Sequence, residues 1–92
     1  MITEKTLITV SKLYKKIFNE SVENSKEFTN FTEGNPHPLR IKVEDMFNQT
    51  MDYDILSMSN NPNVDTQPLV NKMDLLMELD TIIMTYIDNN YV

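Results

Sequence analysis

The chain has 92 residues, of which 40% are hydrophobic, so we expect one small domain with a single modest core. It contains no cysteine, which excludes disulfides and thiolate metal sites. Its 14 acidic and eight basic side chains give a net charge of −6, and this charge is unevenly placed. Residues 1–42 hold seven basic and five acidic side chains, a net charge of +2; residues 43–92 hold one basic and nine acidic, a net charge of −8. Such a field repels nucleic acid and attracts proteins with basic surfaces.

Targeting signals are not evident in the chain. The first residues lack the basic start and long apolar run of a signal peptide. No apolar run approaches the roughly 20 residues of a membrane span. We therefore expect a soluble intracellular protein that binds neither membranes nor nucleic acid.

A first helix is predicted from apolar residues that recur at helical spacing up to residue 18. Thr3 is placed to cap it, and Glu4 lies in its first turn, where the helix dipole favours a negative charge. Its apolar positions follow an i, i+3, i+4, i+7, i+8 pattern. They are Val10, Leu13, Tyr14, Ile17 and Phe18, with Leu7 one turn earlier.

A second helix is predicted after a break at residues 19–21. It carries Val22, Phe28 and Phe31, and Gly34, the single glycine of the chain, follows at a natural C′ position. The segment Asn-Pro-His-Pro at residues 35–38 is predicted to be a loop, because proline lacks an N–H and restricts its preceding residue.

The second half of the chain predicts two or three more helices. A short third helix starts near residue 39, and Asp52 is placed to cap a fourth. After a loop at residues 60–63, Asp65 or Thr66 caps a long last helix with Pro68 in its first turn. The apolar positions of the third and fourth helices are Val43, Met46, Phe47 and Met51, then Tyr53, Leu56 and Met58. Those of the last helix are Leu69, Met73, Leu76, Met77, Ile83, Met84, Ile87 and Tyr91.

These elements predict an all-α fold, a single small domain over residues 1–92 with four or five helices and a long C-terminal helix. The methionines of the last helix have two interpretations. Met73, Met77 and Met84 are core fillers in the first and an adaptable contact surface, used in a homodimer, in the second.

Catalytic and metal sites are not predicted. Nucleophilic catalysis needs a nucleophile, a base and an orienting group, and His37, the single histidine, is expected on a solvated loop. One glycine cannot build a phosphate-binding loop. Asp52 and Asp54 could share a divalent cation, but no segment has the spacing of a calcium loop. We expect no enzyme activity, no cofactor and no metal.

Charged side chains divide into a basic and an acidic set. Lysines recur along the first helix, where a nucleic-acid patch is the weaker interpretation and a solvated face the stronger. They are Lys5, Lys12, Lys15 and Lys16. The carboxylates step along the later helices, and several elements together could imitate the phosphates of a DNA duplex; the alternative is a solvated acidic face.

The candidate phosphate mimics form two groups. The principal group is Asp52, Asp54, Asp65, Asp74, Glu78 and Asp88. The second group extends this surface; it is Glu20, Glu23 and Glu27 on the second helix, with Lys26 as their local counter-charge, and Glu44 and Asp45 at the start of the third.

The opening segment MITEKTLITV (residues 1–10) and the closing segment MTYIDNN (residues 84–90), with the length and acidity of the chain, resemble the Arn-type anti-restriction proteins of T-even bacteriophages. The resemblance spans the whole chain. It implies a helical homodimer that mimics double-stranded DNA. It also implies, as the partner, a host modification-dependent restriction endonuclease of the McrBC type, and hence the bacterial cytoplasm as the location.

A second resemblance covers about a third of the chain. The segment ITVSKL (residues 8–13) and several later positions are similar to the first two helices of AsiA-type phage anti-sigma factors. Those positions are Glu20, residues 22–24, Phe28 and Phe31. This resemblance implies the alternative function, binding of a host RNA polymerase sigma factor through an apolar helix face.

Overall fold

The computed structural model describes the backbone of residues 3–60 and 67–90 and the side chains of residues 3–52 and 67–89. The elements are α1 (Glu4–Phe18), η1 (Val22–Asn24), α2 (Lys26–Thr32), α3 (His37–Asn60) and α4 (Gln67–Asn90), of which η1 is a short 3-10 helix. No strand occurs in these two ranges. The prediction of an all-α fold with a long C-terminal helix is confirmed.

The limits of α1 follow from its local sequence. The Thr3 side chain accepts a hydrogen bond from the Thr6 N–H at 3.2 Å, which confirms the predicted cap. At the other end Asn19 adopts the left-handed conformation, φ 55°, and its N–H donates to the Lys15 carbonyl at 2.9 Å. Asparagine tolerates this conformation better than most residues, so the chain can turn there.

The predicted second helix is two elements, η1 and α2, separated at Ser25. The Ser25 side chain accepts a hydrogen bond from the Phe28 N–H at 3.1 Å and therefore caps α2. Gly34 follows the α2 C-cap with φ +96°, which confirms its predicted C′ role, because side chains with a Cβ avoid this region.

The predicted third and fourth helices are a single helix, α3, so the cap assigned to Asp52 is wrong. No glycine or proline occurs between residues 39 and 60, and a capping residue alone does not end a helix that no helix-breaking residue interrupts. The helix also begins earlier than predicted, at His37, with Pro38 in its first turn, where proline is tolerated. Glu44 and Asp45 consequently lie two turns inside α3 and do not open it.

Helix α4 begins at Gln67 with Pro68 in its first turn, as predicted. The proposed caps, Asp65 and Thr66, lie outside the described residues. Its buried face carries Leu76, Leu79 and Ile83. Leu79 was missing from the predicted stripe.

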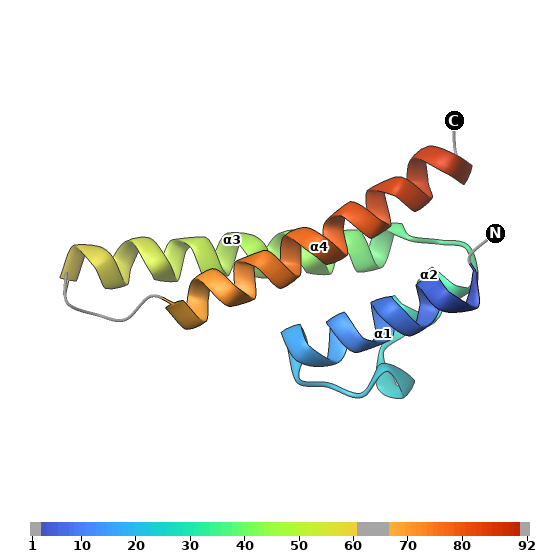
Figure 1. Ribbon diagram of the computed structural model, residues 1–92, viewed down its shortest axis with the longest axis horizontal. Helices are drawn as coiled ribbons and strands as arrows, with labels where there is room; N and C mark the ends of the chain where they lie inside the picture. Colours follow the sequence, from blue (N-terminus) through green and yellow to red (C-terminus); the bar gives the residue numbers. More distant parts are fainter. Residues whose placement is uncertain (1–2, 61–66, 91–92) are drawn as a thin grey trace.

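Helices α3 and α4 lie side by side and run in opposite directions, while α1 packs on α4 and α2 packs on α3 (Figure 1). The molecule measures 46 × 28 × 20 Å. One core joins the four helices, and it confirms most of the predicted apolar positions. Its buried apolar members are Val10, Leu13, Tyr14, Ile17, Phe31, Leu39, Val43, Leu76, Leu79 and Ile83.

The methionines of α4 separate into two environments. Met73 and Met84 are half-buried, whereas Met77 is 56% exposed and does not fill the core. Five large apolar side chains are exposed in the described residues and are available for an apolar contact with another molecule. They are Ile8, Ile41, Met51, Val70 and Met77.

Candidate functional site

The carboxylates of α4 share one exposed helix face. Asp74 and Glu78 are one turn apart, and Asp88 follows Asp74 by 14 residues, which is close to four turns. All three are exposed, opposite the buried face that packs into the core. At a rise of about 1.5 Å per residue, the three carboxylates span about 21 Å along the helix. We call Asp74, Glu78 and Asp88 the α4 row.

A second exposed face on α3 carries Glu44, Asp45 and Asp52, which we call the α3 row. Asp45 and Asp52 are seven residues apart, about two turns, and lie opposite the side that buries Leu39 and Val43. Two other predicted members cannot be placed: the side chain of Asp54 and the whole of Asp65 lie outside the described residues.

Helices α3 and α4, which carry the two rows, run antiparallel, and α3 extends beyond the first turn of α4 at the end where the chain connects them (Figure 1). Each helix has 24 residues, and residues 61–66 connect them.

One member of the α3 row is partly neutralised. Arg40 Nε lies 3.1 Å from Glu44 Oε1, one helical turn away, and both side chains are exposed. A pair of this kind contributes little to stability, on the order of 0.3–0.5 kcal/mol. No ion pair within the described residues involves the other carboxylates of the two rows.

The acids predicted on a second helix are spread over three elements. Glu20 lies between α1 and η1, Glu23 lies in η1, and Glu27 lies in the first turn of α2. Lys26, their local counter-charge in the sequence, makes no ion pair with a described residue. Lys42 of α3 reaches across and lies 3.1 Å from Glu20 Oε2 and 3.8 Å from Glu27 Oε2.

Lys42 is the centre of a polar cluster that the sequence did not predict. Its Nζ donates to the Tyr14 hydroxyl at 2.6 Å, and that hydroxyl donates to Glu20 Oε2 at 2.9 Å. The ammonium also lies 5.0 Å from the centre of the Tyr14 ring and 4.8 Å from that of Phe18. We call Lys42, Tyr14, Glu20 and Glu27 the Lys42 clasp; it ties α1, the segment before η1, and α2 to α3.

The clasp shifts two pKa values. The hydrogen bond from Lys42 lowers the pKa of Glu20, and the Tyr14 hydroxyl and the charge of Lys42 act in the same direction. Burial acts to lower the pKa of Lys42, but its bonds to Tyr14 and Glu20 outweigh burial, so that this pKa is raised. Both shifts favour the charged forms that hold the clasp together.

A prediction for pH follows from the lowered pKa of Glu20. Its contribution to stability is complete above the ordinary carboxyl pKa and is lost as the pH falls through the lower pKa of the folded state. Denaturant midpoints between pH 7 and pH 3 are therefore expected to fall more for the wild type than for Glu20→Gln. Identical pH profiles for the two proteins would contradict this role of Glu20.

The lysines of α1 form a separate basic stripe. Lys5, Lys12 and Lys16 recur at i, i+7 and i+11 on the exposed side of the helix, with Lys15 beside them. None of the four makes an ion pair with a described residue. The opposite side of α1 packs on α4, so this stripe faces away from the core.

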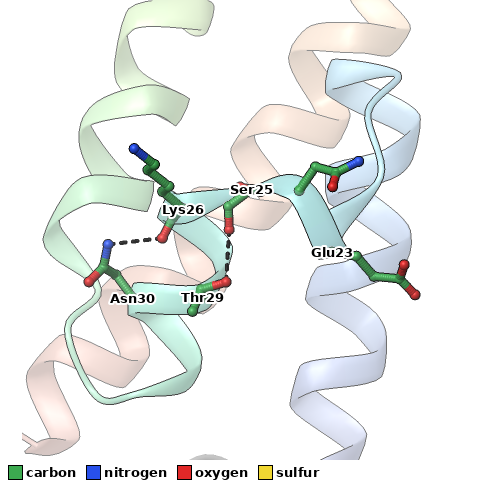
Figure 2. Close-up of a pocket in the computed structure, with 6 residues that line it drawn as sticks. Glu23, Ser25, Lys26, Thr29 and Asn30 are labelled. Carbon is green, nitrogen blue, oxygen red and sulfur yellow. Dashed lines mark hydrogen bonds between the residues drawn. The ribbon is translucent and has the colours of Figure 1, made fainter.

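An open hollow of about 240 Å³ lies at the corner of η1 and α2 (Figure 2), lined by Glu23, Asn24, Ser25, Lys26, Thr29 and Asn30. Its Thr29 hydroxyl and Asn30 amide donate to backbone carbonyls at 3.0 and 2.9 Å. His37 is exposed in the first turn of α3, away from these residues in the sequence.

The described residues contain no group of three or more histidine, cysteine, aspartate or glutamate side chains placed to hold a metal ion. None of their helices combines the length and apolarity needed to cross a membrane.

Comparisons of the chain with protein-family models, curated proteins and solved structures find no match. The resemblance to Arn-type proteins therefore stays a prediction. The interpretation of the surface depends on its geometry and charge.

Proposed function

We propose that the protein is a non-enzymatic inhibitor that mimics double-stranded DNA and occupies the DNA-binding site of a modification-dependent host restriction endonuclease. The observation that supports this most is the pair of exposed carboxylate rows on adjacent antiparallel helices. Each carboxylate would accept hydrogen bonds from a lysine or arginine of the target in place of a phosphate oxygen.

The dimensions are compatible with such a role. The long axis of 46 Å equals the axial length of about 13 phosphates of one DNA strand, at about 3.4 Å each. In the α4 row Asp74 and Glu78 are about 6 Å apart and Glu78 and Asp88 about 15 Å apart, so this row meets three of the roughly six phosphates that it spans. Asp45 and Asp52 on the adjacent α3 supply further acids.

A homodimer is part of the proposal. Two copies carry 28 carboxylates and would lengthen the acidic surface. The exposed side chains of Met77 and Val70 on α4 are available for an apolar contact between copies. Val70 and Met77 lie four residues before and three residues after Asp74, on the same side of α4, so such a contact would border the α4 row.

The proposed repulsion within the rows predicts a response to salt without any partner. Asp74 and Glu78 are like charges one turn apart, and such pairs destabilise a helix. Raising ionic strength from about 0.01 M to 0.15 M shortens the Debye length from about 30 Å to 8 Å. We expect the melting temperature to rise over this range. A constant melting temperature would count against a concentrated acidic surface.

Binding to a purified McrBC-type endonuclease tests the function directly. Contacts between carboxylates and basic side chains predict an affinity that falls steeply with salt, as DNA binding does. Calorimetric titrations at several salt concentrations give the slope. Absence of binding at low salt would refute the proposed target.

The alternative, binding of a sigma factor through an apolar helix face, finds less support. Leu13 and Ile17 are buried in the core, so the apolar face of α1 is already occupied by α4. Among Leu13, Ile17 and Met77, the apolar residues considered for that contact, Met77 alone is exposed. Salt-insensitive binding that Met77→Ala weakens would favour the alternative.

A further inference from the structure

We propose that Lys42 determines which carboxylates a basic partner meets, by withholding Glu20 and Glu27 and confining the interacting surface to the outer faces of α3 and α4. The inference deepens the proposed function and rests on it for the identity of the partner. Among the predicted phosphate mimics on these helices and in the Lys42 clasp, it separates a presented group, Asp45, Asp52 and the α4 row, from a withheld group, Glu20 and Glu27.

Both glutamates of the Lys42 clasp already have partners within the protein. One oxygen of Glu20, Oε2, accepts from both Lys42 Nζ, at 3.1 Å, and the Tyr14 hydroxyl, at 2.9 Å. A lysine or arginine of a partner would have to displace two existing donors to use this oxygen. Glu27 Oε2 is likewise engaged, since it accepts from the Ser25 hydroxyl at 3.2 Å and lies 3.8 Å from Lys42 Nζ.

The Lys42 clasp also has a smaller net negative charge than the α4 row. Lys42 reduces the combined charge of Glu20 and Glu27 from −2 to −1. The α4 row keeps its charge of −3, because none of its members makes an ion pair with a described residue. Attraction of a cationic partner follows the uncompensated charge, so the α4 row is the stronger attractor.

The Lys42 side chain is held in place by several neighbours. Its ammonium is held by two aromatic rings and the Tyr14 hydroxyl as well as by the carboxylates. Tyr14 itself is fully buried in the core. Lys42 is therefore a fixed counter-charge, unlike the exposed lysines of α1, and it acts as a positioning residue for Glu20.

Octalysine, a basic probe without structure of its own, tests the division. Side-chain carboxyl resonances are followed by NMR while octalysine is added to the wild-type protein at low salt. Asp74, Glu78 and Asp88 are expected to shift, whereas Glu20 and Glu27 are expected to stay in place. Shifts of Glu20 and Glu27 as large as those of the α4 row would overturn the inference.

Lys42→Met adds a second measurement. The variant is expected to make Glu20 and Glu27 respond to octalysine and to return the pKa of Glu20 towards its ordinary value. Lys72→Met, which changes the net charge equally on α4, is the control and is expected to leave both glutamates unresponsive. If the carboxyl resonances of Glu20 and Glu27 do not shift with octalysine in a folded Lys42→Met protein, the inference is also overturned.

The titration of the wild-type protein tests the inference even if Lys42→Met fails to fold. In Lys42→Arg, which keeps the positive charge, the Glu20 carboxyl resonance is expected not to shift with octalysine. The same variants with the endonuclease separate the two proposals. Octalysine shifts confined to the rows, together with no binding of the endonuclease, would sustain the division of the carboxylates and refute the proposed target.

Discussion

Truncation of Phe31 to alanine is expected to destabilise the protein by about 3–5 kcal/mol, the usual cost of removing a buried aromatic ring. Phe31 is fully buried, and its ring centre lies 5.3 Å from that of Tyr86 on α4. It is the one buried apolar residue of α2, a helix of seven residues that is too short to be stable without tertiary contacts. Small domains have a total stability of about 5–15 kcal/mol, so this variant should be largely unfolded on modest heating.

Ile41→Ala is the matched control. Ile41 is 58% exposed on α3, and truncation there is expected to change stability by about 0.5 kcal/mol or less. Urea denaturation followed by circular dichroism compares the two variants with the wild type. Equal midpoints for Phe31→Ala and Ile41→Ala would contradict the core described above.

The double variant Asp74→Asn/Glu78→Gln is expected to weaken binding of the endonuclease on the order of 30-fold. This figure assumes about 1 kcal/mol for each exposed charge pair. The salt dependence of binding should also become shallower, because two contacts are lost. Stability of the protein itself is expected to stay the same or rise, since a like-charge pair is removed.

A control for net charge is available elsewhere on the surface. Glu4→Gln/Glu33→Gln also changes the net charge from −6 to −4, and both residues are exposed outside α3 and α4. Its affinity for the endonuclease is expected to stay within about twofold of the wild type, because long-range charge is largely screened. Equal losses from the two double variants would mean that overall charge, not the α4 row, drives binding.

Helical periodicity predicted most of the fold, and its failures are of two kinds. The caps Thr3 and Gly34 were predicted correctly. The Thr3 side chain accepts a hydrogen bond at the start of α1, and Gly34 adopts the positive φ that follows the end of α2. The cap assigned to Asp52 was wrong because the same residue type is tolerated on the exposed face of a long helix. Met77 illustrates the opposite error, in which an apolar side chain at core spacing faces solvent.

Sequence spacing placed Asp74, Glu78 and Asp88 on one face, because residues on a single helix have a fixed relation to each other. It could not place Glu20 and Glu27, whose partner Lys42 lies 22 and 15 residues away in the sequence and meets them only through tertiary packing. One signal was present. Lys42 directly precedes Val43 and lies three residues after Leu39, at the edge of the apolar stripe of α3, where a lysine can reach across to a neighbouring helix.

Competition with DNA tests the central claim most directly. A labelled duplex is bound to the McrBC-type endonuclease at low salt, and the protein is added while the anisotropy of the label is recorded. Mimicry predicts that the duplex is released in proportion to the protein bound, and that release weakens as salt is raised. A duplex that stays bound while the protein joins the complex would contradict the claim, because the two would then occupy different sites.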